Sequence, residues 1–115
     1  MMRRILSFKY AFNGIFLTFK KGANFRIQSS LGVLAVILGF VLHISPLEWA
    51  IIVLLIGIVL SAEIFNTMLE EVAGDLPDDK VRGETKDMSA GFVLILAIAS
   101  LVIGLIIFLP KIIQL

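Results

Sequence analysis

The sequence contains no cysteine and few charged residues of either sign. Of its 115 residues, 17% are charged and 59% are hydrophobic, whereas soluble domains average about 25% charged and about 45–50% apolar residues. Without cysteine, the chain can form neither a disulfide framework nor a thiolate metal site. A soluble domain of this length buries too little surface to hide so many apolar side chains. We therefore expect a single domain whose solvent is largely lipid.

Acidic residues are missing from the first 26 positions, which hold six of the ten lysines and arginines. Seven of the nine acidic residues fall between positions 70 and 87 instead. A basic N-terminal arm can bind nucleic acid. Beside long apolar stretches, attraction to anionic lipid headgroups is the better interpretation. We expect a membrane partner and no nucleic acid.

Three apolar stretches are candidate transmembrane helices, at about 27–44, 47–72 and 87–109. A helix needs roughly 20 residues to cross the hydrocarbon core of a bilayer. A short turn containing Pro46 separates the first two stretches, and proline suits the first turn of the helix that follows it. A hydrophilic segment from Gly74 to Gly83 separates the last two. The sequence predicts an all-α protein with three membrane spans.

Residues 3–21 are predicted to form an amphipathic helix lying on the membrane surface. This segment has no compact apolar core of the kind found in signal peptides, because lysines and an asparagine interrupt it. At 100° per residue, one stripe collects large apolar side chains, namely Ile5, Phe8, Phe12, Ile15, Phe16 and Phe19. The alternative is that this stripe packs against protein.

Orientation is predicted from lysine and arginine, since acidic residues influence topology little. The N-terminal region and the segment 74–86 hold nine of the ten basic residues, and the turn at 43–48 holds none. The N-terminus and the second connection should therefore be cytoplasmic, and the C-terminus should lie outside.

The second apolar stretch carries a polar face. Glu63, Asn66, Thr67 and Glu70 fall within about 100° of one another on a helix. A carboxylate at membrane depth costs several kcal/mol, about 2.5–3.5 on insertion scales, unless a partner, a metal or a water-filled cavity receives it. This face is therefore a candidate site. The alternatives are that these groups pair across helices or lie close to the headgroups.

Glu63 and Glu70 must have different roles, because seven residues of helix separate them by about 10.5 Å. Glu63 is expected to lie deeper and to suit a general base. Glu70 is expected near the cytoplasmic surface, where it could bind a metal that arrives with a nucleotide. Lys86 and Asp87 are expected to open the third helix at a similar depth, where a lysine suits a phosphate. No glycine-rich loop precedes a Lys-Ser or Lys-Thr pair, which excludes the common nucleotide-binding motif.

At these residues the sequence resembles a family of small prokaryotic integral-membrane kinases, which includes diacylglycerol kinase and undecaprenol kinase. The most specific matches are Glu-x-x-Asn-Thr-x-x-Glu from position 63 and Lys-Asp at position 86. The matching stretches cover nearly the whole chain, at 8–11, 24–26, 48–49, 63–70, 86–91 and 104–111.

The resemblance implies a surface helix and three transmembrane helices, assembled as a homotrimer in the bacterial inner membrane. It implies transfer of a phosphoryl group from ATP, with Mg²⁺, to the hydroxyl of undecaprenol or diacylglycerol at the cytoplasmic interface. By position, Glu63 matches the catalytic base and Glu70 a metal ligand. Nucleotide-binding or site-organising roles fall to five further residues, namely Tyr10, Arg26, Asn66, Lys86 and Asp87.

The sequence departs from the family at two carboxylate positions. Gly22 stands where the family has a metal-binding glutamate, and Gly74 stands where it has an aspartate. Gln28 replaces a histidine or glutamate, and the loop after Gly74 looks about two residues shorter than is usual. Asp75 and Glu71 are the neighbouring acids that could compensate.

Two other classes of function are weighed against the kinase. A degenerate kinase, or a small oligomeric membrane protein of the holin type, would share the size and number of spans. A holin-like protein has no need of a polar face with two glutamates inside a helix. A proton-coupled transporter using Glu63 would normally need more spans and internal repeats, which the sequence does not contain.

Overall fold

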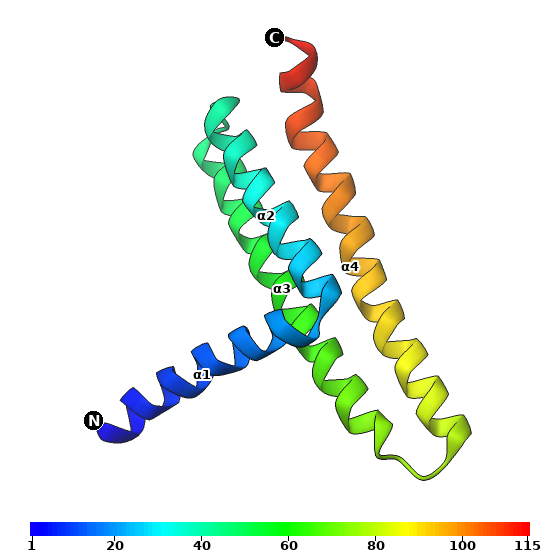
Figure 1. Cartoon of the computed structure of the whole chain (residues 1–115). Coiled ribbons are helices and arrows are strands. Elements are labelled where there is room, and N and C mark those ends of the chain that lie inside the picture. The colour runs from blue at the N-terminus through cyan, green and yellow to red at the C-terminus, as the bar shows by residue number, and fades with distance from the viewer.

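The computed structural model describes all 115 residues. It consists of four α-helices, α1 (Met2–Lys21), α2 (Ala23–Val41), α3 (Pro46–Gly74) and α4 (Asp79–Ile113). The last three are each long and apolar enough to cross a membrane. They run alongside one another, whereas α1 projects away from them (Figure 1). The expected all-α architecture with three membrane spans is therefore found.

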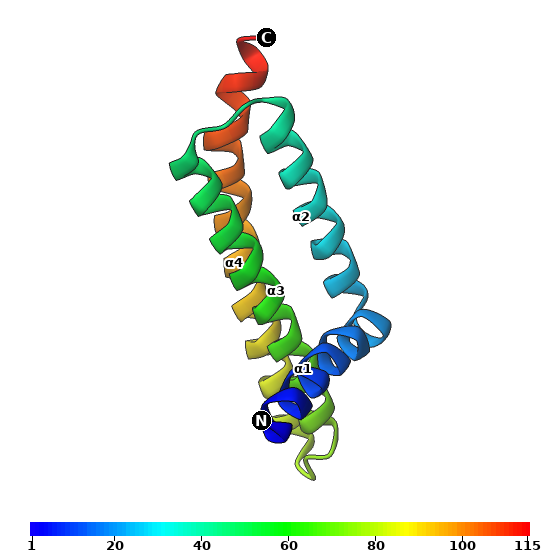
Figure 2. The same ribbon diagram turned by 90° about the vertical axis from the view of Figure 1, so that its left-hand side faces the viewer.

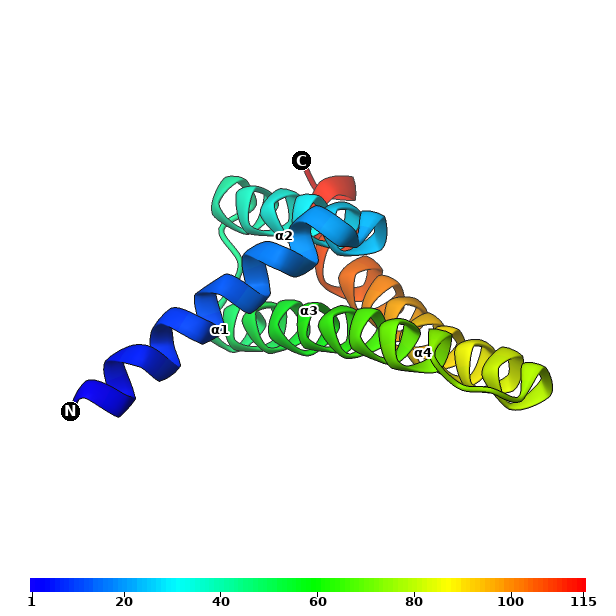
Figure 3. The ribbon, with the colours of Figure 1, turned by 60° about the horizontal axis from the view of Figure 1, so that its bottom comes forward.

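Consecutive helices of the bundle run in opposite directions. The turn between α2 and α3 and the C-terminus lie at one end of the molecule, and the connection between α3 and α4 lies at the other (Figure 2). In Figure 3, which brings that second end forward, α1 extends outward beyond the bundle. Because α1 joins α2 near this second end, the basic N-terminal region and the acidic connection lie at the same end.

The turn between α2 and α3 follows from its residues. His43 has a positive φ of 53°, and the Ile44 N–H donates to the Gly39 carbonyl at 3.2 Å, which closes the end of α2. Ser45 then caps α3. Its hydroxyl accepts from the Glu48 N–H, the Glu48 carboxylate accepts from the Ser45 N–H, and Pro46 occupies the first turn. The expected helix start at Pro46 is thus observed.

Side chains next to this turn form the main apolar cluster. The Trp49 indole lies on Gly39, where a Cβ would come within 2.6 Å of the ring, and its centroid is 4.8 Å from that of Phe40. The Glu48 carboxylate also pairs with the Lys111 ammonium at 3.2 Å. The start of α3 is therefore held to both α2 and the end of α4. Four buried residues complete the cluster, namely Ile44, Ile52, Ile107 and Phe108.

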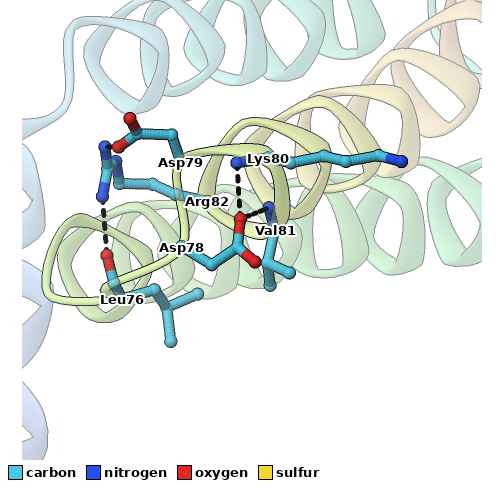
Figure 4. A network of polar contacts seen from close by, with 6 residues as sticks. All are labelled: Leu76, Asp78, Asp79, Lys80, Val81 and Arg82. Atoms are coloured by element: carbon cyan, nitrogen blue, oxygen red, sulfur yellow. Dashed lines mark hydrogen bonds and ion pairs between the residues drawn. The ribbon is translucent and has the colours of Figure 1, made fainter.

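The connection between α3 and α4 is shorter than the sequence led us to expect. We expected a hydrophilic loop from 74 to 83 and a helix opened by Lys86 and Asp87, but α4 already begins at Asp79. The Asp78 carboxylate accepts from the backbone N–H groups of the two residues that follow Asp79 (Figure 4). Arg82 pairs with Asp79 and donates to the Leu76 carbonyl. These capping contacts start the helix two turns before its apolar part.

Most of the apolar surface is left uncovered by the chain itself. Only 13 of the 115 residues are buried, so the remaining apolar side chains require lipid or further protein around them. A groove of about 490 Å³ runs between α2, α3 and α4. Its lining is almost entirely apolar, with Gln28 as one of its few polar members. In α1, the aromatic side chains of the predicted stripe are likewise exposed.

Candidate functional site

The polar face of α3 forms as the 3.6-residue period requires. Glu63 and Asn66 are 4% and 5% exposed, whereas Glu70, one turn nearer the end of the helix, is exposed. The Thr67 hydroxyl donates to the Glu63 carbonyl at 3.0 Å, as hydroxyls within helices commonly do. The face thus runs from a buried acid to an exposed one within a single helix.

Asn66 is the centre of a three-residue hydrogen-bonded chain. Its Oδ1 accepts from the Ser89 hydroxyl of α4 at 2.5 Å, and its Nδ2 donates to the Glu70 Oε1 at 3.3 Å. Ser89 is 4% exposed. The sequence prediction missed this residue, although a hydroxyl inside an apolar span needs a partner and thereby signals one.

Glu63 has no hydrogen-bonding partner for its carboxylate. No fully buried side-chain oxygen in the chain is left unpaired, so both Glu63 oxygens keep an accessible edge although the residue as a whole is buried. A carboxylate that is desolvated, unpaired and accessible at its oxygens can accept a proton from a group that approaches it. This arrangement suits the role predicted for Glu63.

Lys86 and Asp87 lie on different sides of α4. Because α3 and α4 are antiparallel and Asn66 faces Ser89, Lys86 lies about one turn from Ser89, at the level of Glu70. Asp87, two residues before Ser89, lies about 200° around the helix from it, on the far side from α3. Both residues are exposed. The helical period therefore places Lys86 nearer the polar face than Asp87, and neither side chain makes a hydrogen bond or an ion pair within the chain.

The junction of α1 and α2 rests against the same part of α3. A Cβ on Gly22 would lie 3.3 Å from the Thr67 Oγ1, so position 22 borders the polar face. Next to it, the Lys21 ammonium donates to the Glu71 carboxylate at 2.7 Å. Glu71, named above as a compensating acid, is therefore already engaged by a lysine.

Two residues assigned to the site by resemblance make no hydrogen bond to the polar face within the single chain. Arg26 donates from Nη1 to the carbonyls of Phe19 and Lys20, at 2.7 and 3.0 Å, and so closes the end of α1. Tyr10 is 64% exposed on α1. Asp75 caps α3 through its backbone N–H, and its side chain is exposed.

The polar face of a single chain offers few ligands for a divalent cation. Glu70 is exposed, and only its Oε1 accepts a hydrogen bond, which leaves Oε2 free for a hard cation such as Mg²⁺. No three His, Asp or Glu side chains gather within the chain. Glu70 therefore fits as one protein ligand among oxygens from other sources, which is the usual manner in which Mg²⁺ is bound with a nucleotide.

Comparison with known proteins identifies the family. The family model for prokaryotic diacylglycerol kinase matches residues 9–108. An undecaprenol kinase from Bacillus subtilis is 41% identical over 108 residues, covering 91% of this chain and 87% of the relative. A diacylglycerol kinase from Synechocystis is 34% identical over 115 residues, covering 96% of this chain and 65% of the relative. No solved structure matches the chain. With its Glu-Asn-Glu face on one membrane-spanning helix and its Lys-Asp pair on the next, the chain belongs to the prokaryotic diacylglycerol kinase family.

Proposed function

We propose that this protein transfers the γ-phosphoryl group of ATP to the hydroxyl of a membrane lipid at the cytoplasmic face of the bacterial inner membrane. The observation that carries the proposal is the division of the α3 polar face into a buried Glu63, whose carboxylate has no hydrogen-bonding partner, and an exposed Glu70, which accepts from Asn66. The Glu63 carboxylate would accept the proton of the lipid hydroxyl, and the Glu70 carboxylate would hold the metal ion that accompanies the nucleotide. The names of the two relatives support a lipid acceptor.

The depth of the site supports this division. The end of α1 meets α3 at Thr67, and a helix with an exposed aromatic stripe on one side is suited to the membrane interface. With α1 in that plane, Glu63 lies about 6 Å toward the membrane interior and Glu70 about 4.5 Å toward the cytoplasm. A lipid hydroxyl would then approach from one side and a soluble nucleotide from the other.

The proposed reaction needs one base. The lipid hydroxyl oxygen attacks the γ-phosphorus, and the bond from that phosphorus to its bridging oxygen breaks. ADP leaves with the electron pair, and the hydroxyl proton passes to the Glu63 carboxylate. Phosphoryl transfer depends mainly on positioning and charge neutralisation, so a small polar cluster can be sufficient.

The other residues of the face would handle the phosphates. Glu70 would hold Mg²⁺, which neutralises phosphate charge when it is bound. Lys86, at the same level on α4, would pair with a phosphate oxygen. The hydrogen bond from the Asn66 Nδ2 to the Glu70 Oε1 holds the Glu70 side chain along the helix.

A homotrimer would complete the site from neighbouring chains. Asp87 and Tyr10 are exposed and lie away from the polar face of their own chain. The apolar faces of α2 and α4 are also largely uncovered. The basic end of the molecule is expected to lie in the cytoplasm. A second chain packed against the uncovered apolar faces of α2 and α4 would bring its own Asp87 and Tyr10 to the polar face of α3 in the first chain.

Undecaprenol is the first candidate acceptor and diacylglycerol is the second. The test is to supply purified full-length protein, in lipid vesicles, with γ-labelled ATP, Mg²⁺ and each lipid separately. We expect labelled undecaprenyl phosphate to form faster than labelled phosphatidic acid. Faster formation of labelled phosphatidic acid would make diacylglycerol the preferred acceptor. The absence of label in both lipids would reject the kinase.

A catalytically inactive relative is the second candidate, and glycine at positions 22 and 74 favours it. Losing two carboxylates weakens the affinity for a divalent cation. Thermal unfolding with and without Mg²⁺–ATP separates the two candidates, because a ligand that binds only the folded state raises its melting temperature. We expect a rise for the kinase and none for the inactive relative, whose cation affinity is weakened.

A further inference from the structure

The Ser89 hydroxyl makes a close contact between the two helices that carry the polar residues. Its Oγ donates to the Asn66 Oδ1 at 2.5 Å, and both side chains are at least 95% buried. Ser89 is not among the residues to which the sequence assigned a role. Serines within helices often bond back to their own helix, whereas this one reaches across to α3.

The contact to Glu70 selects one orientation of the Asn66 amide, and the contact to Ser89 holds the amide in place in that orientation. With Oδ1 on the Ser89 side, the amino group faces the Glu70 carboxylate and donates to its Oε1 at 3.3 Å. If the amide were turned by 180°, its carbonyl oxygen would face that carboxylate, and two acceptors would oppose each other. The serine hydroxyl gives the buried carbonyl a partner that Glu70 cannot provide.

The orientation of Asn66 in turn determines how Glu70 presents its oxygens. Glu70 is exposed and would otherwise sample several rotamers. The bond from Nδ2 engages Oε1 and leaves Oε2 without a hydrogen bond. A carboxylate held in this way has one oxygen directed away from its support and ready for a cation.

We propose that Ser89 is a positioning residue that prepares Glu70 for a divalent cation by fixing the Asn66 amide. The inference rests on the proposed function, because it concerns the metal that accompanies the nucleotide. Ser89 itself touches neither metal nor substrate. Its effect should therefore appear in cation affinity, and it should require Asn66.

The test compares wild type with Ser89→Ala as full-length protein in lipid vesicles. Lipid phosphorylation is measured against free Mg²⁺, and binding of Mn²⁺ together with ATP is measured independently by the paramagnetic signal of Mn²⁺. We expect Ser89→Ala to raise the Mg²⁺ concentration for half-maximal rate, and to weaken Mn²⁺ binding, by about 10-fold, the lower end for residues that support a metal ligand. Ser89→Thr keeps the hydroxyl and should restore most of the affinity.

Two controls separate positioning from simple packing. Ser100→Ala removes a hydroxyl from a half-buried position of the same helix, and should leave both cation measurements unchanged. In an Asn66→Ala background, Ser89→Ala should have no further effect, because its partner is already gone. An additive effect in that background, or an equal loss in Ser100→Ala, would overturn the proposal.

The two readouts also keep this inference distinct from the kinase. If the wild type phosphorylates lipid but Ser89→Ala leaves the cation dependence unchanged, the inference fails and the kinase stands. If no lipid is phosphorylated but Mn²⁺ binding weakens in Ser89→Ala and recovers in Ser89→Thr, the inference stands and the kinase fails. If the wild type binds no Mn²⁺ with ATP, both are rejected.

Discussion

Gly22, at the junction of α1 and α2, lies against Thr67 of α3, so that a Cβ on the glycine would come within 3.3 Å of the threonine hydroxyl. The position that carries a glutamate in the family, according to the resemblance, thus borders the polar face of α3. Its φ of −102° is open to any L-residue. The φ angle therefore does not oppose a side chain there, but a Cβ would also lie 3.1 Å from the Thr18 carbonyl oxygen, so both Thr18 and Thr67 must shift by a few tenths of an ångström to admit one.

Restoring an acid at position 22 should strengthen cation binding. We expect Gly22→Glu to lower the Mg²⁺ concentration for half-maximal lipid phosphorylation by about 10-fold, since affinity rises with the number of charged ligands. Gly22→Ala controls for the space that the Cβ takes and should not lower it. Equal behaviour of the two variants would mean that a carboxylate at position 22 does not reach the cation.

Glu71 should not contribute to cation binding, although it follows Glu70 directly. Its carboxylate accepts from the Lys21 ammonium at 2.7 Å, and this pairing ties α1 to α3. Glu71→Gln should therefore leave the Mg²⁺ dependence of the rate unchanged, whereas Glu70→Gln should abolish activity at ordinary Mg²⁺ concentrations. A Mg²⁺ titration of both variants checks this. A loss of cation affinity in Glu71→Gln would show that Glu71 replaces the missing family carboxylate.

The packing of Trp49 on Gly39 should be important for stability. A Cβ at position 39 would lie 2.6 Å from the indole Cη2 and 3.1 Å from the Ile44 Cδ1. We expect Gly39→Ala to destabilise the protein by about 1–3 kcal/mol, the usual cost of overpacking, as measured by thermal unfolding in detergent. Gly57→Ala is the matched control, because no atom lies within 4 Å of a Cβ at that position. Equal stability of the two variants would contradict the close packing of the indole.

The exposed stripe of α1 should contact lipid. Because the chain has no cysteine, single spin labels can be placed at Phe12→Cys on the stripe and Gly14→Cys about 200° away from it. We expect the first label to be more accessible to oxygen, which concentrates in lipid, and the second to a water-soluble relaxation agent. An immobilised label at position 12 that neither reagent reaches would show instead that the stripe packs against protein.

Much of this architecture follows from the sequence because membrane constraints are simple. Span length, Pro46 and the period that places Glu63, Asn66 and Glu70 on one face all act locally along the chain. The same reasoning missed the start of α4, because the expected loop was judged by its charges and by Gly83, and the capping role of Asp78 was overlooked.

Local sequence patterns did not predict which side chains contact each other across helices. The bond from Ser89 to Asn66 joins residues 23 positions apart, and the use of Arg26 to close α1 depends on the angle between α1 and α2. Each has a weak local signal, such as a hydroxyl within an apolar span. The partner itself becomes visible only once the helices are packed.

The central claim is that Glu63 takes the proton from a lipid hydroxyl during phosphoryl transfer. The direct measurement is the rate of label transfer from γ-labelled ATP to undecaprenol, for wild type and for Glu63→Gln, with Mn²⁺ and ATP binding measured on both proteins. We expect transfer by the wild type, a loss of about 100-fold or more in the variant as for other general bases, and unchanged nucleotide binding. Transfer by Glu63→Gln at the wild-type rate would contradict the account.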